Sequence, residues 1–182
     1  MKLAAAEGRG PSLGPEAPIV IEDASASDYH AVRAALILAH ADHRAELPPA
    51  TFSAYLAELL DLEARAGCSQ LLVARRAGRV LGTVTYYPDA AKQGAGWADE
   101  GWASLSGLAV VPQARQQGVG RWLMGACLSR TRASQVPVLG LHVAEFMLPA
   151  LSLCRQLGFR PAPYFDLKDR PVPAQAYLRL LP

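Results

Sequence analysis

The sequence predicts an α/β domain of the α+β type, in which helices flank both faces of one mixed, mostly antiparallel sheet. Two observations lead to this fold class. Apolar residues recur at helical spacing in some segments and form short continuous or alternating runs in others, so both helices and strands are expected. The two kinds of segment follow one another in mixed order and not in strict alternation, which points away from a purely parallel sheet.

The composition is that of a globular chain. Its 182 residues are 51% hydrophobic and 19% charged, which allows one domain with a sizeable core. No apolar run approaches the roughly 18 residues of a membrane helix, and a formal net charge of +2 is too slight to indicate nucleic-acid binding. Cys68, Cys127 and Cys154 are odd in number and lack metal-ligand spacing, so we expect free thiols in a reducing cytoplasm.

Residues 1–18 are expected to form a flexible N-terminal tail, and residues 19–182 a single domain. Glycines and prolines interrupt the tail, which has almost nothing to bury. The domain should begin with a short strand at residues 19–21, where three β-branched residues follow one another.

Two helices are expected after this strand. The first follows Ser27 or Asp28, either of which can cap it. The second follows the proline pair at 48–49, takes Thr51 as its cap and ends at Gly67. Both carry apolar residues at helical spacing, so each has one face to bury.

A β-hairpin is expected in the middle of the chain. Strands at residues 70–75 and 80–87 are joined by a short turn through Ala77 and Gly78. Residues 88–101 hold glycines and a proline without periodicity, which predicts a long loop of the kind that often serves function. The rest of the chain predicts, in order, a strand at 102–111, a helix from Val119, a strand at 137–143, a helix with Pro149 in its first turn and Gly158 just past its end, and closing strands from 159 and at 175–181.

The stretch GLAVVPQARQQGVGRWLM, residues 107–124, predicts an anion-binding site. It has the pattern of an apolar strand, a turn marked by proline, a glycine-rich loop and a helix start. Gly118 and Gly120 have no Cβ, so the backbone can approach a ligand closely. The first N–H groups of the following helix have no intrahelical partner and carry the positive end of the helix dipole. A phosphate or pyrophosphate would be held well there.

This loop and a later helix together resemble the GNAT superfamily of acetyl-CoA-dependent N-acyltransferases. The stretch RQQGVG at 115–120 is similar to the family's (R/Q)xxGx(G/A) loop, and ALSLCRQLGF at 150–159 is similar to its AxxLYxxxGF helix. The resemblance covers about residues 19–181. It implies a GNAT-like fold with acetyl-CoA as co-substrate.

Two other nucleotide sites fit the glycines less well. A Rossmann site has GxGxxG directly after the first strand and an acidic residue roughly 20 residues on, whereas the glycines here follow a strand in the middle of the chain. A Walker loop is excluded because no Lys-Ser/Thr follows the glycines.

The resemblance also implies where CoA binds. The strand edge at 108–110 pairs with the pantetheine arm, and its N–H donors polarise the thioester carbonyl, where such donors stabilise developing negative charge. The amides of residues 116–121 hold the pyrophosphate, and Arg121 adds positive charge. The implied cofactor-binding residues are Leu108, Ala109, Val110, Arg115, Gln116, Gln117, Gly118, Val119, Gly120 and Arg121.

Transfer to an amine needs a base, because the amine must be neutral to attack. Ser104 stands where many relatives carry a catalytic glutamate, and serine is no base at neutral pH. His142, in Leu-His-Val, matches the glutamate that serves as base in the branch acetylating protein N-termini, and an imidazole suits this task. It is either that base or a hydrogen-bonded, half-buried strand residue. Glu100, beside Asp99, either reaches in from upstream or is a solvated loop charge.

The leaving CoA thiolate benefits from an acid, and here the sequence departs from the family. Cys154 occupies the position of the usual tyrosine, and Met147 that of a frequent asparagine. A thiol with a pKa of about 8.5 can protonate a thiolate, but the spacing of Cys154 equally suits core packing. Tyr86, Tyr87 and Tyr164 are substitutes if the fold brings one of them near.

A polar cluster follows the first helix, where the resemblance places acceptor-binding loops. It consists of His40, Asp42, His43 and Glu46. Asp42 and Glu46 would attract a cationic amine, and the spacing matches no zinc signature, so no metal is expected. Trp97 and Trp102 either line the same pocket or cover the sheet.

The sequence therefore predicts an N-acetyltransferase that transfers an acetyl group directly from acetyl-CoA to a primary amine of a small molecule or a protein. The alternative is an acyl-CoA-binding regulatory module with weak or no catalysis, indicated by Ser104 and the missing tyrosine. The expected partner is the amine acceptor, with no nucleic acid or membrane, and a homodimer is left open.

Overall fold

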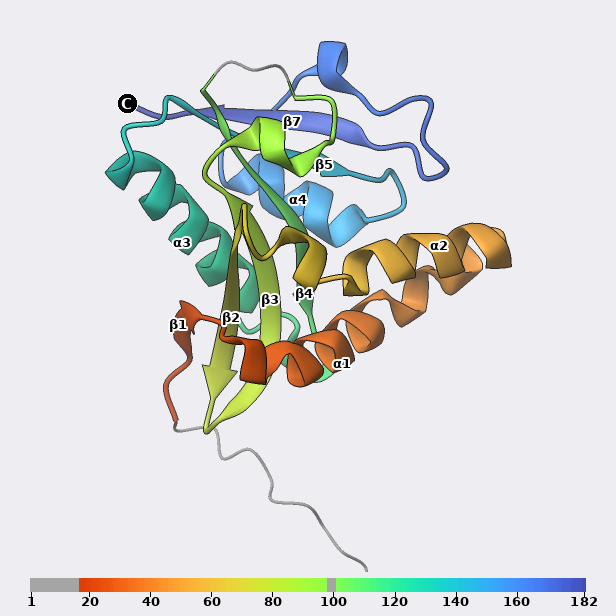
Figure 1. Cartoon of the computed structure of the whole chain (residues 1–182), viewed down its shortest axis with the longest axis vertical. Helices are drawn as coiled ribbons and strands as arrows, with labels where there is room; N and C mark the ends of the chain where they lie inside the picture. The colour runs from red at the N-terminus through yellow and green to blue at the C-terminus, as the bar shows by residue number, and fades with distance from the viewer. Residues whose placement is uncertain (1–16, 98–100) are drawn as a thin grey trace, which may run out of the picture.

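The computed structural model describes residues 17–97 and 101–182, and in these residues seven strands form one sheet in the order β1-β2-β3-β4-β5-β7-β6 (Figure 1). The strands are β1 (Val20–Asp23), β2 (Gln70–Arg76), β3 (Arg79–Tyr87), β4 (Ala103–Val110), β5 (Val138–Val143), β6 (Arg160–Pro161) and β7 (Gln175–Leu180). Only β4 and β5 pair in parallel among the described strands, and the other neighbours are antiparallel. The predicted mixed, mostly antiparallel sheet is confirmed.

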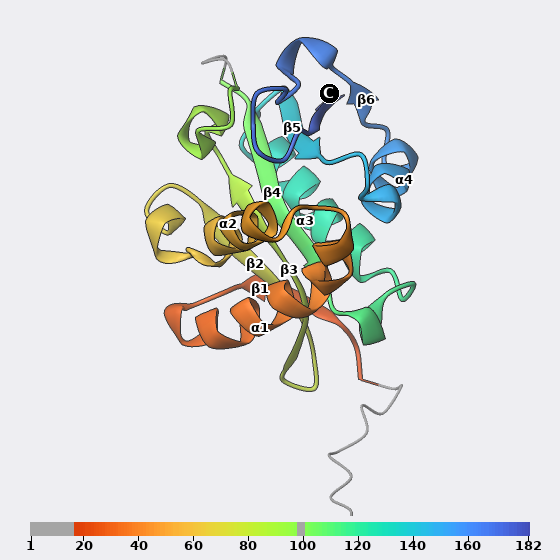
Figure 2. The ribbon, with the colours of Figure 1, turned by 90° about the vertical axis from the view of Figure 1, so that its right-hand side faces the viewer.

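Four α-helices flank the sheet in the part of the chain that the structure describes, two on each face (Figures 1 and 2). They are α1 (Tyr29–His40), α2 (Pro49–Leu60), α3 (Val119–Ala133) and α4 (Leu148–Gln156). Val32 of α1 packs in one buried cluster with Val73 and Ala109, whereas Leu123 of α3 and Leu151 of α4 belong to another. Within the described residues, no helix is long and apolar enough to cross a membrane.

The start of α1 differs from the predicted cap. A 3-10 turn, Ala26–Asp28, precedes the helix, and the carboxylate of Asp28 accepts a hydrogen bond from the Ser25 amide at 2.8 Å. Neither Ser27 nor Asp28 caps α1 with its side chain. Asp28 folds back because its carboxylate also pairs with Arg75 of β2, with 2.5 Å between Oδ1 and Nη2.

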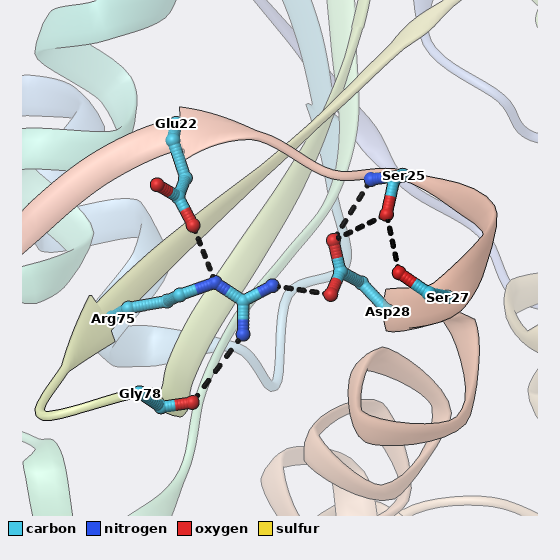
Figure 3. A network of polar contacts seen from close by, with 6 residues as sticks. All are labelled: Glu22, Ser25, Ser27, Asp28, Arg75 and Gly78. Atoms are coloured by element: carbon cyan, nitrogen blue, oxygen red, sulfur yellow. Dashed lines mark hydrogen bonds and ion pairs between the residues drawn. The ribbon is translucent and has the colours of Figure 1, made fainter.

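Arg75 ties the first strand and the first helix to the β2–β3 hairpin (Figure 3). Its Nε lies 2.5 Å from Oε1 of Glu22, its Nη2 meets Asp28, and its Nη1 donates to the Gly78 carbonyl at 3.5 Å. The Arg75 side chain is mostly covered, with 19% of it exposed. Arg75 therefore fixes where α1 begins relative to the sheet.

The second helix is shorter than predicted. It begins at Pro49, whose fixed φ and missing N–H suit a first helical position, so Thr51 lies inside the helix and does not cap it. The helix ends at Leu60, and a separate 3-10 turn, Glu63–Arg65, follows before Gly67. This early end places the turn and its arginine beside the sheet.

The predicted hairpin turn and the end of α4 are confirmed. Ala77 and Gly78 have positive φ angles of 48° and 77°, as a two-residue hairpin turn requires. Gly158, with φ of 80°, follows the last turn of α4. Of the predicted N-terminal tail, residues 1–16 lie outside the described residues.

A β-bulge in β4 reverses the direction of its side chains. Thr83 pairs with Ala109 and Thr85 with Ser106, so β4 has one residue more than β3 across this interval. Gly107 sits in the bulge with φ of 60°, a conformation that glycine adopts at little cost. Before the bulge Leu105 belongs to the buried cluster on the α3 and α4 face, and after it Ala109 belongs to the cluster under α1.

Candidate active site

Strands β4 and β5 separate in the middle of the sheet. They pair at only three positions, the last being Leu105 with Leu141. Beyond it β4 continues along β3 to Val110, and β5 continues along β7 to Val143. The edge of β4 that faces β5 therefore has no strand partner along residues 106–110 among the described strands.

A cavity of about 340 Å³ lies at this separation. On one side it is lined by residues of α2 and its surroundings, including Tyr55, Glu58 and Leu59. On the other side it is lined by Met147 and Cys154 from the region of α4. Because these helices cover opposite faces of the sheet, the cavity connects the two faces between the separated strands.

The glycine-rich loop leads into α3 with its backbone amides free. Gln116 and Gly118 have positive φ angles of 61° and 82°, and α3 begins at Val119. No group of the described residues accepts a hydrogen bond from the amides of residues 116–121. A Cβ on Gly120 would lie 3.2 Å from Cδ2 of Leu153, so glycine lets α3 and α4 approach here. This is the donor-lined helix N-terminus expected of an anion site.

The arginines of this loop are held by neighbouring elements. Arg115 donates through Nη1 to Asp42 at 2.6 Å and through Nη2 to the Ala39 carbonyl at 3.0 Å. Arg121 donates to Oε1 of Gln156 on α4 at 2.5 Å. Arg115 thus joins the glycine-rich loop to the end of α1.

His142 lines the cavity from β5 and is half-buried. Its Nε2 lies 2.9 Å from the Phe165 carbonyl oxygen, which only accepts, so Nε2 carries the hydrogen and Nδ1 keeps its lone pair. Nδ1 is buried without a hydrogen-bond partner among the described residues. Burial lowers the pKa of His142, against the opposing effect of the Phe165 hydrogen bond. A neutral imidazole with a free lone pair can act as a base.

Ser104 lies on the same face of the sheet as His142. It pairs with Gly140, two residues before the histidine, and side chains two apart on a strand share a face. The side chain is fully buried, and its Oγ has no hydrogen-bond partner among the described residues. A buried hydroxyl in this position is no base at neutral pH.

Cys154 lines the cavity on the α4 side, and it is also part of the main buried cluster. Burial raises the pKa of its thiol to about 12. A thiol with so high a pKa is a poor proton donor to the thiolate of another thiol, whose usual pKa is about 8.5. The position therefore favours packing over acid catalysis.

Of the three predicted tyrosine substitutes, Tyr87 alone lines the cavity. Tyr86 lies on the face of the sheet that α3 covers and accepts a hydrogen bond from Thr131 of α3 at 3.3 Å. Tyr164 is 91% exposed. The other predicted base, Glu100, and its neighbour Asp99 lie outside the described residues.

The polar cluster predicted for the acceptor side stays together at the end of α1, with 5.8 Å between the ring centroids of His40 and His43, but most of it does not line the cavity. Only His40 lines the cavity, and its Nδ1 donates to the Leu36 carbonyl at 2.9 Å. Asp42 is engaged by Arg115, while His43 packs against Phe146 with 5.1 Å between ring centroids. No group of metal-ligating side chains occurs in the described residues.

The two tryptophans cover the sheet. Trp97 is buried, lies 4.1 Å from His142 between ring centroids, and contacts Trp102 edge-on at 6.5 Å. Trp102 packs in turn on Phe165 at 5.2 Å. Trp97 thus packs against the His142 ring, and the rings of Trp102 and Phe165 pack against Trp97.

The sequence did not indicate several polar residues of the cavity wall. They are Tyr55, Glu58, Arg65, Ser106 and Arg170. Tyr55 belongs to an apolar helical stripe, and burial together with Glu58 raises its pKa above the usual range. Arg65 and Arg170 come from a 3-10 turn and a loop, where no periodicity marks which side chains point inward.

The sequence matches the model of a known protein family. A family model described as the acetyltransferase (GNAT) family matches residues 35–159. No curated protein matches the sequence significantly.

Solved structures share the fold at low sequence identity. The PaiA N-acetyltransferase from Thermoplasma acidophilum, in complex with coenzyme A, is 13% identical with a TM-score of 0.72, over 90% of this chain and 99% of that one. A GNAT family acetyltransferase from Brucella melitensis, in complex with acetyl-CoA, is 20% identical with a TM-score of 0.63, over 91% and 89%. The ribosomal-protein-S18-alanine N-acetyltransferase from Escherichia coli is 20% identical with a TM-score of 0.60, over 91% and 94%.

Proposed function

The chain belongs to the acetyltransferase (GNAT) family, and on this premise we propose that it transfers an acetyl group from acetyl-CoA to a primary amine. The observation that carries the proposal is the cavity at the separation of β4 and β5, which is lined by residues from both faces of the sheet. An acyl donor on the α4 side and an amine on the α2 side can meet between the strands.

The free amides support the proposed binding of acetyl-CoA. Those of residues 116–121 suit the pyrophosphate, as a helix N-terminus with unpaired donors does. The unpaired edge of β4, Leu108 to Val110, suits an extended chain that offers amide groups of its own. The thioester that acetyl-CoA supplies is the activated acyl group.

We assign the base to His142. The amine attacks the thioester carbonyl as a neutral group, and its surplus proton passes to Nδ1 of the imidazole. The hydrogen bond from Nε2 to the Phe165 carbonyl orients the ring for this role, because it leaves the lone pair on Nδ1. The lowered pKa keeps the ring unprotonated at neutral pH.

The C–N bond forms as the C–S bond breaks, and negative charge develops first on the carbonyl oxygen and then on sulfur. Backbone N–H groups at the β4 edge are the donors we propose for the oxygen, since pre-placed donors stabilise such charge by a few kcal/mol each, about 3 in typical cases. The thiolate of CoA leaves without a dedicated protein acid, because a thiol of pKa about 8.5 is acidic enough for its anion to be a good leaving group, and the thiolate then takes a proton from solvent. Cys154 then serves as cavity wall.

Turnover with acetyl-CoA and a panel of amines tests the proposal. Release of the CoA thiol and the mass of the acetylated amine are measured together, so hydrolysis is distinguished from transfer. Saturable acetyl-CoA binding without acetylation of any amine would favour the acyl-CoA-binding module. The three free cysteines accord with the proposed cytoplasmic location.

A further inference from the structure

Arg65 is an arginine without a carboxylate partner that lines this cavity, and it also lines a second one of about 230 Å³ beside Asp23 and Tyr29 in the part of the chain that the structure describes. It ends the 3-10 turn after α2, and its Nη2 donates to the Leu59 carbonyl. Its Nε is buried and makes no hydrogen bond, and no carboxylate of the described residues lies within 4.0 Å of its guanidinium. A buried guanidinium N–H without a partner is costly, and an anion supplies the partner that it lacks.

Leu59 places this charge close to the separation of the strands. Its carbonyl accepts from Arg65, while its Cδ2 lies 3.8 Å from where a Cβ on Gly107 would stand. One residue thus contacts both the guanidinium and the bulge of β4. A ligand group held by Arg65 lies in the same cavity as the proposed point of acyl transfer.

The charges of the cavity wall sum to a positive value. Glu58 is opposed by Arg65 and Arg170, and Arg170 donates to the Gly94 carbonyl at 3.0 Å without a carboxylate partner in the described residues. His40 and His142 add no charge at neutral pH, because burial lowers the pKa of both. A simple ammonium ion meets net repulsion here, whereas a molecule that also carries an anion does not.

We infer that the acceptor carries an anionic group beside its amine, and that Arg65 binds this group. This inference rests on the proposed transfer to an amine and names the class of acceptor. The planar guanidinium fork matches a carboxylate in two-pronged geometry, so the smallest members of the class are free amino acids. Arg65 acts in binding and orientation and moves no proton.

Pairs of amines with and without an anionic group test the proposed class of acceptor. The twenty common L-amino acids are compared with their carboxamides, their decarboxylated amines and, where these exist, their aminophosphonate analogues. We expect at least one amino acid to exceed its carboxamide about 10- to 100-fold in kcat/KM, the range of a lost charged hydrogen bond. The aminophosphonates show whether carboxylate or phosphonate is preferred. The inference would be overturned if the carboxamides are acetylated with the same kcat/KM as the acids, or if C-terminally amidated peptides are acetylated with a higher one.

A matched pair of variants tests the residue. Arg33 also holds a carbonyl at the end of α2, through Nε to Leu60 at 3.0 Å, but it pairs with Glu63 and does not line the cavity. Arg65→Gln should reduce the acid-to-carboxamide ratio toward one, Arg65→Lys should restore part of it, and Arg33→Gln should leave it unchanged. A general folding defect lowers kcat/KM for both substrates together and leaves the ratio of the two values unchanged. An unchanged ratio in Arg65→Gln contradicts the assignment.

Calorimetric binding without acetyl-CoA separates this inference from the proposed function. If the protein turns over no amine, the proposed function fails. In that case the inference still predicts that an amino acid binds and that its carboxamide does not. It also predicts that Arg65→Gln abolishes the binding of the amino acid. No such binding by any member of the panel would overturn the inference whatever the turnover result.

Discussion

The imidazole of His142 lies against the indole of Trp97, with ring centroids 4.1 Å apart and planes inclined by 34°. The indole in turn lies over Gly140, where an added Cβ would come within 2.9 Å of Cη2 of Trp97. Together with the Phe165 hydrogen bond at 2.9 Å, this packing fixes the histidine from two sides. A ring so held keeps one orientation and one tautomer, with the hydrogen on Nε2.

Replacing His142 with alanine should lower turnover much more than affinity for acetyl-CoA. Removal of a general base typically costs about 10²- to 10⁴-fold in rate. Steady-state kcat and a separately measured Kd for acetyl-CoA check this expectation. His30→Ala, on the exposed side of α1, is the control and should change neither. An unchanged kcat in His142→Ala would remove the histidine from the mechanism.

Thermal stability should fall as the pH drops below about 6.5, the usual pKa of histidine. Burial lowers the pKa of His40, His43 and His142 in the folded protein, so the unfolded chain binds protons that the folded chain does not. Stability from these rings is complete above pH of about 6.5 and is lost as the pH falls through the folded pKa values. Melting curves between pH 5 and 7.5 measure the effect.

His40→Gln separates the histidines from the carboxylates in this experiment. The pKa of Asp28 is lowered by the Ser25 amide and Arg75, so its contribution is lost only below its usual value of about 3.9. Between pH 5 and 6.5 the slope of Tm against pH should therefore be shallower in the variant. A slope equal to that of the parent protein would show that His40 does not contribute.

Gly140→Ala should destabilise the protein. The new methyl group would meet Trp97 at 2.9 Å and Leu178 at 3.1 Å, and overpacking of this kind costs about 1–3 kcal/mol. Gly125→Ala is the matched control, because its Cβ meets nothing within 4 Å in the middle of α3. It should stabilise by about 0.5–1 kcal/mol. Urea unfolding of the two variants measures the difference, and a stable Gly140→Ala would mean that Trp97 can move aside.

Gly118→Ala should weaken acetyl-CoA binding. Its φ of 82° costs a residue with a Cβ roughly 1–2 kcal/mol, so the loop is expected to relax and misplace its amides. The Kd for CoA should rise about tenfold, which corresponds to about 1.4 kcal/mol. Gly67→Ala, with open space around its Cβ and no positive φ, is the control. Equal affinity in the two variants would argue against a binding role for the loop amides.

The cysteines should differ in reactivity. Cys68 is half-buried, whereas Cys127 and Cys154 are buried and burial raises the pKa of both thiols to about 12. A disulfide reagent should therefore modify one thiol quickly in the native protein and the other two only on unfolding. Rapid modification of Cys154 would show that its thiol is accessible from the cavity, and would restore it as a candidate acid.

Local signals in the sequence predicted the local structure well. Gly78 and Gly158 lie where the backbone has positive φ, and glycine marks both positions in the sequence. Gly107 is also a glycine with positive φ, but the run Leu-Ala-Val that follows it continues the strand pattern and does not indicate a bulge. The reversal of side chains across it depends on the pairing with β3, which no local pattern records.

The candidate site was predicted in the same uneven way. The glycine-rich loop leads into α3 with free amides, and His142 lines the cavity from β5, each in the element that the sequence predicts for it. Their roles stay predictions. Asp42 and His43 are neighbours in sequence but point to Arg115 and Phe146, so the polar cluster did not form a pocket. Arg65 reaches the cavity because α2 ends early at Leu60, a tertiary effect without a sequence signature.

The three residue pairs between β4 and β5 have a mechanical consequence. They form a short seam between two half-sheets, β1 to β4 on one side and β5 to β7 on the other. Any extended ligand that hydrogen-bonds along the free edge of β4 lengthens this seam, in the manner of an added strand. Such a ligand would then brace the two halves against each other, so that the protein is stiffer with the ligand bound than without it.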